Sequence, residues 1–243
     1  MGHDAVLHDR AETGPVVVAL TARAGGVSEG PYAALNLGDH VGDDPVAVAE
    51  NLRRLADALE VERVVGMTQV HGSDVAVVGS DSDEPTADAM VTVEPGVALL
   101  VRVADCLPVV LADPEAGVVG VAHAGRKGLE LGVVPRTVGV MREHGAAGLR
   151  AWTGPHACGR CYEVPADMAA EVERVAPGSA SRTSWGTAAI DLAAGVAAQL
   201  TAADVLVEQL PGCTIEDDTF FSHRRQGGTA GRFGMVVVNR GPA

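Results

Sequence analysis

The chain has 243 residues and a formal net charge of −14, because 32 acidic residues outnumber 18 Lys and Arg. An acidic chain repels nucleic-acid phosphates, which excludes a protein that binds nucleic acid irrespective of its sequence; any anionic substrate must be held by a local cluster of basic residues. Hydrophobic residues make up 47% of the chain but aromatic residues only 3%, so Val, Ala and Leu must build the core.

Runs of apolar and β-branched residues predict eight strands. In chain order they cover residues 16–22, 64–68, 75–78, 89–92, 98–103, 109–112, 118–122 and 233–238. Between residues 64 and 122 the strands follow one another without room for crossover helices. This spacing favours a mixed or antiparallel sheet over a regular βαβ alternation.

Four helices are predicted, at residues 45–59, 128–144, 165–176 and 192–202. Asp44 is a good N-cap for the first helix, and Pro45 suits its first position. Pro135 interrupts the second helix, and Asp191 caps the last. No linker rich in Pro or Ser and no internal repeat divides the chain, so a single domain over residues 1–243 is expected.

The most apolar stretch, residues 97–112, is interrupted by Arg102 and Asp105 and is too short to span a membrane. Four Cys residues do not form a disulfide framework, and the first residues do not resemble a signal peptide. Cys158 and Cys161 form a lone C-x-x-C without a second pair, so a structural zinc ribbon is not expected. These features predict a soluble cytoplasmic protein.

Three short segments each place one metal-ligand side chain in a tight turn with apolar flanks. They are Gln-Val-His-Gly at 69–72, Ala-Asp-Cys-Leu-Pro at 104–108 and Ala-His-Ala-Gly at 122–125. The flanking runs place His71, Cys106 and His123 at strand ends, where a rigid element aims each side chain. Two His and one Cys can hold zinc with a fourth position open. A Cys–His pair for nucleophilic catalysis is the alternative, and packed side chains without chemistry are a third.

Two other segments could hold an anion. Residues 26–30 match the G-x-S-x-G elbow of serine hydrolases, but Pro31 follows where that elbow needs a helix, so we interpret the match as chance. A Gly-rich loop beside Arg23 suits an anion, or is a plain surface turn. Arg224 and Arg225 precede a Gly pair and could close over a phosphate or carboxylate, or could pair with nearby acidic residues.

Together these motifs resemble one known family. In order they are RAGGVS at 23–28, LNLG at 35–38, QVHG at 69–72, ADCLPV at 104–109, AHAG at 122–125, GP at 154–155, CYEV at 161–164, CT at 213–214 and FFSHRR at 220–225. From about residue 23 to residue 240 the chain is similar to the YfiH/YlmD family, also called laccase-domain or polyphenol-oxidase-like proteins and related to FAMIN.

The resemblance implies an α+β fold with α/β/β/α layers, in which mixed sheets are flanked by helices, as in a bacterial toxin deamidase domain. It also implies zinc bound by His71, Cys106 and His123. Family members are described as purine nucleoside phosphorylases that act on adenosine, inosine and methylthioadenosine and that also deaminate adenosine. The expected partners are therefore a purine nucleoside and phosphate, with neither nucleic acid nor a membrane; the oligomeric state is left open.

The hypothesis assigns roles to individual residues. The expected catalytic residues are His71, Cys106, His123 and Asp105. The expected substrate contacts are Arg23, Asn36, Gln69, Lys127 and Arg224. Asp105 would orient a ligand or carry a proton, or would simply cap its turn. Arg23 and Lys127 would hold phosphate.

One motif departs from the family pattern. The family usually reads His-Ala-Gly-Trp-Arg-Gly, whereas this chain has Arg126 and Lys127 in place of Trp and Arg. Lys keeps the positive charge but cannot form the planar, bidentate hydrogen bonds of a guanidinium to phosphate. The loss of Trp also removes an aromatic face, so the substrate preference is left open.

Two other functions are alternatives. An amidase that edits a peptidoglycan precursor would use the same zinc, or Cys106 as nucleophile with His123 as base. A non-catalytic metal-binding protein linked to cell division would use neither phosphate nor water. Copper would compete with zinc for the same ligands. A multicopper oxidase centre is excluded, because the chain has eight His and no His-x-His pair.

Overall fold

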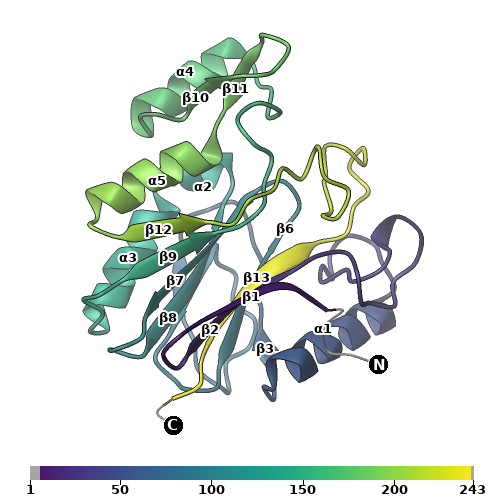
Figure 1. Ribbon diagram of the computed structural model, residues 1–243, viewed down its shortest axis with the longest axis vertical. Helices are drawn as coiled ribbons and strands as arrows, with labels where there is room; N and C mark the ends of the chain where they lie inside the picture. The colour runs from purple at the N-terminus through teal and green to yellow at the C-terminus, as the bar shows by residue number, and fades with distance from the viewer. Residues whose placement is uncertain (1–5, 242–243) are drawn as a thin grey trace.

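Two stacked β-sheets form the centre of the fold (Figure 1). The computed structural model describes residues 6–241, so residues 1–5 and 242–243 of the expected domain lie outside the described part. The five-stranded sheet has the order β1 (Leu7–Thr13), β2 (Val16–Thr21), β13 (Phe233–Asn239), β6 (Ala98–Val103) and β3 (Val64–Val65). The six-stranded sheet has the order β12 (Leu206–Gln209), β9 (Arg150–Thr153), β7 (Leu107–Asp113), β8 (Val118–Ala124), β5 (Ala89–Thr92) and β4 (Val75–Val77). A separate pair is formed by β10 (Ala180–Arg182) and β11 (Ala188–Ile190).

Strands β2, β13 and β6 of the five-stranded sheet are buried on both faces, and their successive residues point to opposite sides. In β2, Val18 and Leu20 join the core between the two sheets. Val17 and Ala19 instead pack in the core beneath α1 (Pro45–Leu59). The first helical layer therefore covers the outer face of this sheet.

The six-stranded sheet is covered from the other side. Its outer face is covered by α2 (Arg126–Leu131), α3 (Val133–Glu143) and α5 (Leu192–Ala202), whereas α4 (Ala166–Val175) packs against β10 and β11 (Figure 1). Buried residues of these helices share one core with β5, β7 and β8. The order helix, sheet, sheet, helix confirms the layered α+β fold.

The predicted helix at 128–144 is two helices, and the predicted reason for its interruption was wrong. Gly132 adopts φ 72°, a left-handed conformation that favours glycine, and it ends α2. Pro135 lies in the first turn of α3, where a backbone N–H has no partner within the helix and its loss costs little. The break therefore falls at the glycine.

Local signals set the bounds of two helices. The α1 and α5 helices span the predicted residues, and both predicted N-caps are present: Asp44 accepts from the Val46 N–H and Asp191 from the Ala194 N–H, each at 2.9 Å.

A short 3-10 helix covers Gly30–Tyr32. Five strands, β1, β9, β10, β11 and β12, were not predicted. They are short or, like the edge strand β1, carry mainly exposed polar residues without an apolar alternation. Among residues 6–241 no helix is long and apolar enough to cross a bilayer.

Candidate active site

His71, Cys106 and His123 come together where β7 begins and β8 ends. His123 is the next-to-last residue of β8 and pairs with Pro108 of β7, and Cys106 immediately precedes β7. His71 lies in a turn with φ 58°. One nitrogen or sulfur atom of each residue lies within 4.8 Å of the others, and the His71 Nε2 is 3.8 Å from the Cys106 Sγ. We call these three residues the triad.

A buried carboxylate holds both histidines of the triad. The Asp88 Oδ1 accepts from the His123 Nδ1 at 2.9 Å and from the backbone N–H of His71 at 2.9 Å. Its Oδ2 accepts from the backbone N–H groups of Gly72 at 2.6 Å and Val70 at 3.2 Å. Because the His123 Nδ1 is engaged, the Nε2 is the nitrogen left for a ligand. Asp88 therefore orients one imidazole and fixes the turn that carries the other.

Two glycines of the sequence motifs allow this close packing. A Cβ atom on Gly125 would lie 2.9 Å from the Cys106 Sγ and 3.1 Å from the His71 Cδ2. A Cβ atom on Gly72 would lie 3.3 Å from the Asp88 Oδ2. The first distance is shorter than side chains tolerate, so a side chain at position 125 would separate the triad.

The thiol and the facing imidazole shift each other's protonation. Burial raises the pKa of Cys106, but the positive charge of His123 and hydrogen bonds from both histidines outweigh burial and lower it to about 6. Burial lowers the pKa of His123, but the Cys106 thiolate and Asp88 outweigh it and raise that pKa to about 9. Near pH 7 the triad without a metal therefore favours a thiolate beside an imidazolium.

The triad fits a metal ion in distance and in donor type. A tetrahedral zinc ion with bonds of about 2.0–2.3 Å holds its ligand atoms roughly 3.3–3.8 Å apart. The separation of 3.8 Å between the His71 Nε2 and the Cys106 Sγ agrees with this range. Two imidazoles and one thiolate are zinc ligands that leave a fourth position open. The bond from His123 to Asp88 is the support that metal-bound imidazoles usually have.

A cavity of about 270 Å³ opens beside the triad. Its volume lies near the lower end of the range of small-molecule sites, about 300–1,000 Å³. The apolar groups that line it are Val103, Ala104, Ala157, Leu192 and the ring of Tyr162. The basic residues that line it are His40, Arg102, Arg126, His223, Arg224 and Arg232. The cavity therefore suits a small anionic or polar molecule with an apolar part.

Two of the cavity arginines are paired with acidic side chains. Arg102 is buried and bonds Glu84, and its Nη1 lies 3.3 Å from an Asp39 carboxylate oxygen. Arg126 donates to Glu130 one turn further along α2, at 2.6 Å. Arg102 is thus held within the wall, whereas the Arg126 ion pair is half-buried and exchangeable.

Among the described residues, the guanidinium groups of Arg224 and Arg232 donate hydrogen bonds only to backbone carbonyl groups. The Arg224 Nη1 donates to the Glu163 carbonyl at 2.8 Å, and its guanidinium lies 5.1 Å from the centre of the Tyr162 ring. The Arg232 Nη1 donates to the Ala230 carbonyl at 2.8 Å. Within residues 6–241 neither guanidinium forms an ion pair. Their charges are therefore available to an anion in the cavity.

Residues 17–240 match the model of a family described as multi-copper polyphenol oxidoreductase laccase. The chain belongs to this family. Over 236 residues it is 52% identical to "Purine nucleoside phosphorylase ORF3" of Streptomyces griseus, covering 93% of this chain and 96% of that protein. Over 249 residues it is 38% identical to "Purine nucleoside phosphorylase YlmD" of Geobacillus stearothermophilus, covering 92% of this chain and 90% of that protein.

Solved structures of the laccase-like family share the fold. A Neisseria meningitidis protein superposes with a TM-score of 0.86 at 32% identity, over 96% of this chain and 99% of that chain. YlmD from Geobacillus stearothermophilus superposes with a TM-score of 0.83 at 34% identity, over 97% and 99%. These findings confirm the resemblance to YfiH and YlmD proteins.

The descriptive name of the laccase-like family does not agree with the histidines of this chain. The sequence has eight His and no His-x-His pair. Within the described residues, the triad is the one group of clustered metal-ligand side chains that contains histidine. The donor set therefore supports a metal site with the three ligands of the triad rather than a multicopper centre.

Among the expected substrate contacts and catalytic residues, three side chains line the cavity beside the triad. Gln69 exchanges two hydrogen bonds with the Arg102 backbone, at 2.8 and 3.0 Å, and so joins its loop to β6. Asp105 has φ 89°, and its carboxylate accepts from the Thr214 hydroxyl and from the Arg224 N–H, each at 2.7 Å. Arg224 is the third. Asp105 thus ties the Cys106 turn to the loop that carries Arg224.

Three other expected substrate contacts do not line the cavity. The Arg23 Nε donates to a backbone carbonyl, and its guanidinium lies 4.8 Å from the centre of the Phe221 ring. Lys127 is exposed, and its neighbour Arg126 faces the cavity instead. Asn36 is buried and accepts from the Arg232 N–H at 2.8 Å. In this structure Asn36 therefore supports a cavity arginine from behind.

Several residues of the site were given no role from the sequence. Asp88 is an acidic residue at the start of a buried strand, a signal that could have been used. Tyr162 lies within a family motif, and Arg126 occupies the position of the family Trp. Arg232 only precedes the last strand, and no local pattern marks it.

Proposed function

We propose that this protein is a zinc-dependent purine nucleoside phosphorylase that cleaves adenosine, inosine and methylthioadenosine with inorganic phosphate. The names of the Streptomyces and Geobacillus relatives support this proposal. The observation that carries it is that Arg126, Arg224 and Arg232 line one cavity with the triad. In a chain of net charge −14, such a group of cations is the feature that phosphate binding requires.

Phosphate would bind between the guanidinium groups. Each guanidinium can present two parallel N–H donors to two phosphate oxygens. Arg224 and Arg232 have no acidic partner within the described residues, and Arg126 would exchange Glu130 for phosphate. Burial lowers the pKa of Arg232, and binding an anion would compensate for its buried charge.

The nucleoside base would pack against apolar lining residues of the cavity. Val103, Ala157 and Leu192 are residues of this kind. Tyr162 adds an aromatic ring, and its stack with the Arg224 guanidinium holds it in place. This tyrosine offers an aromatic face to the purine in a chain that has Arg126 at the position of the family Trp.

The reaction would be a displacement at the ribose carbon C1′. Zinc, when bound by the triad, would supply a Lewis acid beside the reacting oxygens. The arginines would aim one oxygen of hydrogen phosphate at C1′ as the bond from C1′ to N9 breaks. The electron pair of that bond goes to the purine, which takes up the proton of hydrogen phosphate. The products are the free base and ribose 1-phosphate, or 5-methylthioribose 1-phosphate when methylthioadenosine is the substrate.

Deamination of adenosine would be a side activity at the same site. Water would take the place of phosphate and add to the purine carbon that bears the amino group, from which ammonia then leaves. This step needs no anion-binding group, so it depends less on the arginines than phosphorolysis does.

The proposal is tested by the phosphate dependence of base release. The zinc-loaded protein is incubated with adenosine, inosine or methylthioadenosine, with and without phosphate, and the base and ribose 1-phosphate are measured by chromatography. We expect base and sugar phosphate in equal amounts, and only with phosphate. A folded, zinc-loaded protein that releases no base would contradict the phosphorylase assignment.

A cysteine-dependent amidase acting on a peptidoglycan precursor is the second candidate. Cys106 contacts His123, and His123 contacts Asp88. This is the arrangement of nucleophilic thiol, imidazole base and orienting carboxylate that cysteine hydrolases use. The metal-free protein would then hydrolyse an amide without phosphate, and Cys106→Ser would lose this activity. Failure of both assays would favour the non-catalytic, metal-binding alternative.

We also propose that the protein acts in the cytoplasm. All four cysteines are free in the structure. Thiols that serve as metal ligands or nucleophiles persist best in a reducing compartment. Fractionation with a thiol-labelling reagent tests this: a protein recovered outside the cytoplasm with oxidised cysteines would contradict it.

A further inference from the structure

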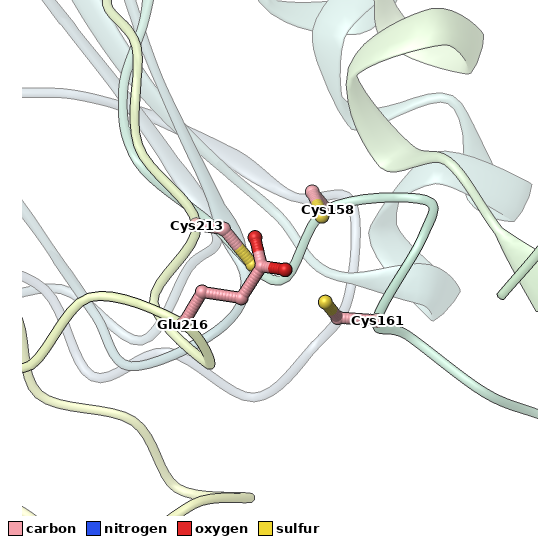
Figure 2. A group of neighbouring side chains, drawn as sticks. All are labelled: Cys158, Cys161, Cys213 and Glu216. Carbon is pink, nitrogen blue, oxygen red and sulfur yellow. The ribbon is translucent and has the colours of Figure 1, made fainter. Parts of the chain in front are cut away.

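A second group of metal-ligand side chains lies outside the cavity. It consists of Cys158, Cys161, Cys213 and Glu216, which we call the thiol cluster (Figure 2). The three sulfur atoms and a carboxylate oxygen all lie within 4.8 Å of one another. Figure 2 shows the three sulfurs pointing into a common space between two loops, with the carboxylate beside Cys213. The C-x-x-C of the sequence is therefore not alone.

The two loops present their ligands with the same spacing. Cys158 and Cys161 are separated by two residues, and so are Cys213 and Glu216. Both turns are closed by the backbone: the Cys161 N–H donates to the Cys158 carbonyl at 2.9 Å, and the Glu216 N–H to the Cys213 carbonyl at 3.1 Å. Structural zinc sites present ligand pairs at this short spacing.

The loops are also held against each other next to the ligands. His156 and Cys213 form a parallel β-bridge, and the Thr214 N–H donates to the His156 carbonyl at 3.0 Å. Gly212 has φ 146°, and a Cβ atom there would lie 3.0 Å from Pro155. A larger residue at this position would therefore be strained and would push the two ligand pairs apart.

A second glycine fixes the other end of the arrangement. A Cβ atom on Gly159, inside the C-x-x-C turn, would lie 2.7 Å from the Cβ of Asp191, the N-cap of α5. The turn thus packs directly on a helix end. The positions of Cys158 and Cys161 are therefore set by the fold and do not need a metal to arrange them.

We propose that the thiol cluster is a structural zinc site. Three thiolates and one carboxylate complete the four ligands of a closed tetrahedral centre, with no position left for substrate. Iron–sulfur clusters usually take four Cys, so this donor set suits zinc better. A disulfide would engage only two of the three sulfurs and would leave Glu216 without a role.

The expected consequence concerns the walls of the cavity. Tyr162 follows Cys161 directly, and its N–H donates to the Cys158 carbonyl at 2.9 Å. Thr214, within the other turn, donates to Asp105, which in turn accepts from the Arg224 N–H. Zinc in the thiol cluster would join the two loops that carry Tyr162 and Arg224. It would position substrate-binding side chains without touching substrate.

Metal content tests this proposal in the full-length protein. The protein is purified under reducing conditions without added metal, and zinc is counted by mass spectrometry. We expect about two zinc ions per chain in the native protein and about one in Cys106→Ala, which lacks the thiolate of the triad. Combining Cys106→Ala with Cys161→Ser should remove the remaining zinc. Combining it with Glu216→Gln should weaken zinc retention against a chelator, whereas the control Asp218→Asn, on the same loop but outside the thiol cluster, should not.

A spectroscopic measurement avoids variants of the thiol cluster. Cobalt bound by thiolates gives a charge-transfer band in the near ultraviolet, which imidazole and carboxylate ligands do not give. The Cys106→Ala protein loaded with cobalt should show this band, because its remaining thiols are those of the thiol cluster. Absence of the band, absence of zinc from folded Cys106→Ala protein with three reduced thiols, or a disulfide within the thiol cluster of freshly reduced protein would each overturn the proposal. These readouts do not depend on enzymatic activity.

Discussion

The Asp88 Oδ1 lies 2.9 Å from the Nδ1 of His123 and also accepts the backbone N–H of His71 at 2.9 Å. One carboxylate oxygen thus connects two histidines that are far apart in the sequence. Burial opposes the ionisation of Asp88, but hydrogen bonds from His123 and from the Gly72 N–H outweigh it, and the pKa of Asp88 is lowered. A charged carboxylate behind the imidazole fixes the ring and increases its basicity toward a metal.

Asp88→Asn should weaken zinc binding at the triad about 10- to 100-fold, the range found for outer-sphere partners of metal-bound histidine. An amide removes the negative charge and replaces one acceptor by a donor. Zinc affinity is measured by competition with a chromogenic chelator. Asp74→Asn, an exposed residue on the neighbouring turn, is the control and should leave the affinity unchanged. Equal affinities in both variants would show that Asp88 serves only the fold.

Gly125→Ala should remove zinc from the triad while the protein stays folded. The added methyl group would lie 2.9 Å from the Cys106 Sγ and 3.1 Å from the His71 Cδ2, so the sulfur and the imidazole must separate. Zinc per chain and the melting temperature are measured together. The control is Gly139→Ala in α3, where no described residue lies within 4 Å of the added atom apart from the neighbouring residues and the backbone of the helix itself. That control should retain zinc and gain about 0.5–1 kcal/mol of stability, because alanine favours the helix. Full zinc in Gly125→Ala would mean that the triad is looser than its packing indicates.

Arg126→Ala should raise the KM for phosphate about 10- to 100-fold, because a hydrogen bond to a charged group contributes about 1.5–3 kcal/mol. The neighbouring Lys127→Ala is the matched control, since Lys127 is exposed and does not line the cavity. Steady-state kinetics of base release at varied phosphate give both constants. The proposed side activity as an adenosine deaminase should change less, because water needs no anion site. A larger effect of Lys127→Ala than of Arg126→Ala would restore the role first assigned to the lysine.

Alkylation of Cys106 in the chelator-treated protein should follow a midpoint near pH 6. The lowered pKa of about 6 means that the thiolate is present above that pH and is lost as the pH falls through it. An ordinary cysteine reacts with a midpoint about two or more pH units higher. Mass spectrometry of the labelled peptide separates Cys106 from the other thiols. In His123→Gln the midpoint should move upward, because the neighbouring positive charge is gone. An unshifted midpoint would contradict the pairing of thiolate and imidazolium.

Local patterns in the sequence were sufficient for the bounds of several elements of the fold, but β7 and β8, which carry Pro108 and His123, extend beyond the predicted residues. The strands at 89–92 and 98–103 and the helices at 45–59 and 192–202 have the predicted bounds. Hydrophobic periodicity and N-caps act over a few residues and are visible without the fold. The residue types of the triad, each just before a Gly or Pro, also follow from short motifs, and the order of the motifs indicated the family.

Other features depend on residues that meet only in the folded chain. Asp88 is a single acidic residue until the pairing of β5 with β8 places it behind His123. Arg126 and Lys127 are adjacent basic residues, and the sequence does not show which of them faces the site. In the fold, the helical turn directs Arg126 into the cavity and Lys127 to solvent. Cys213 lies near Cys158 because a β-bridge pairs Cys213 with His156 on a distant loop. Periodicity along a chain reports which face of an element is buried, whereas contacts between distant segments are set by how sheets and loops pack, and these contacts decide what the site can bind.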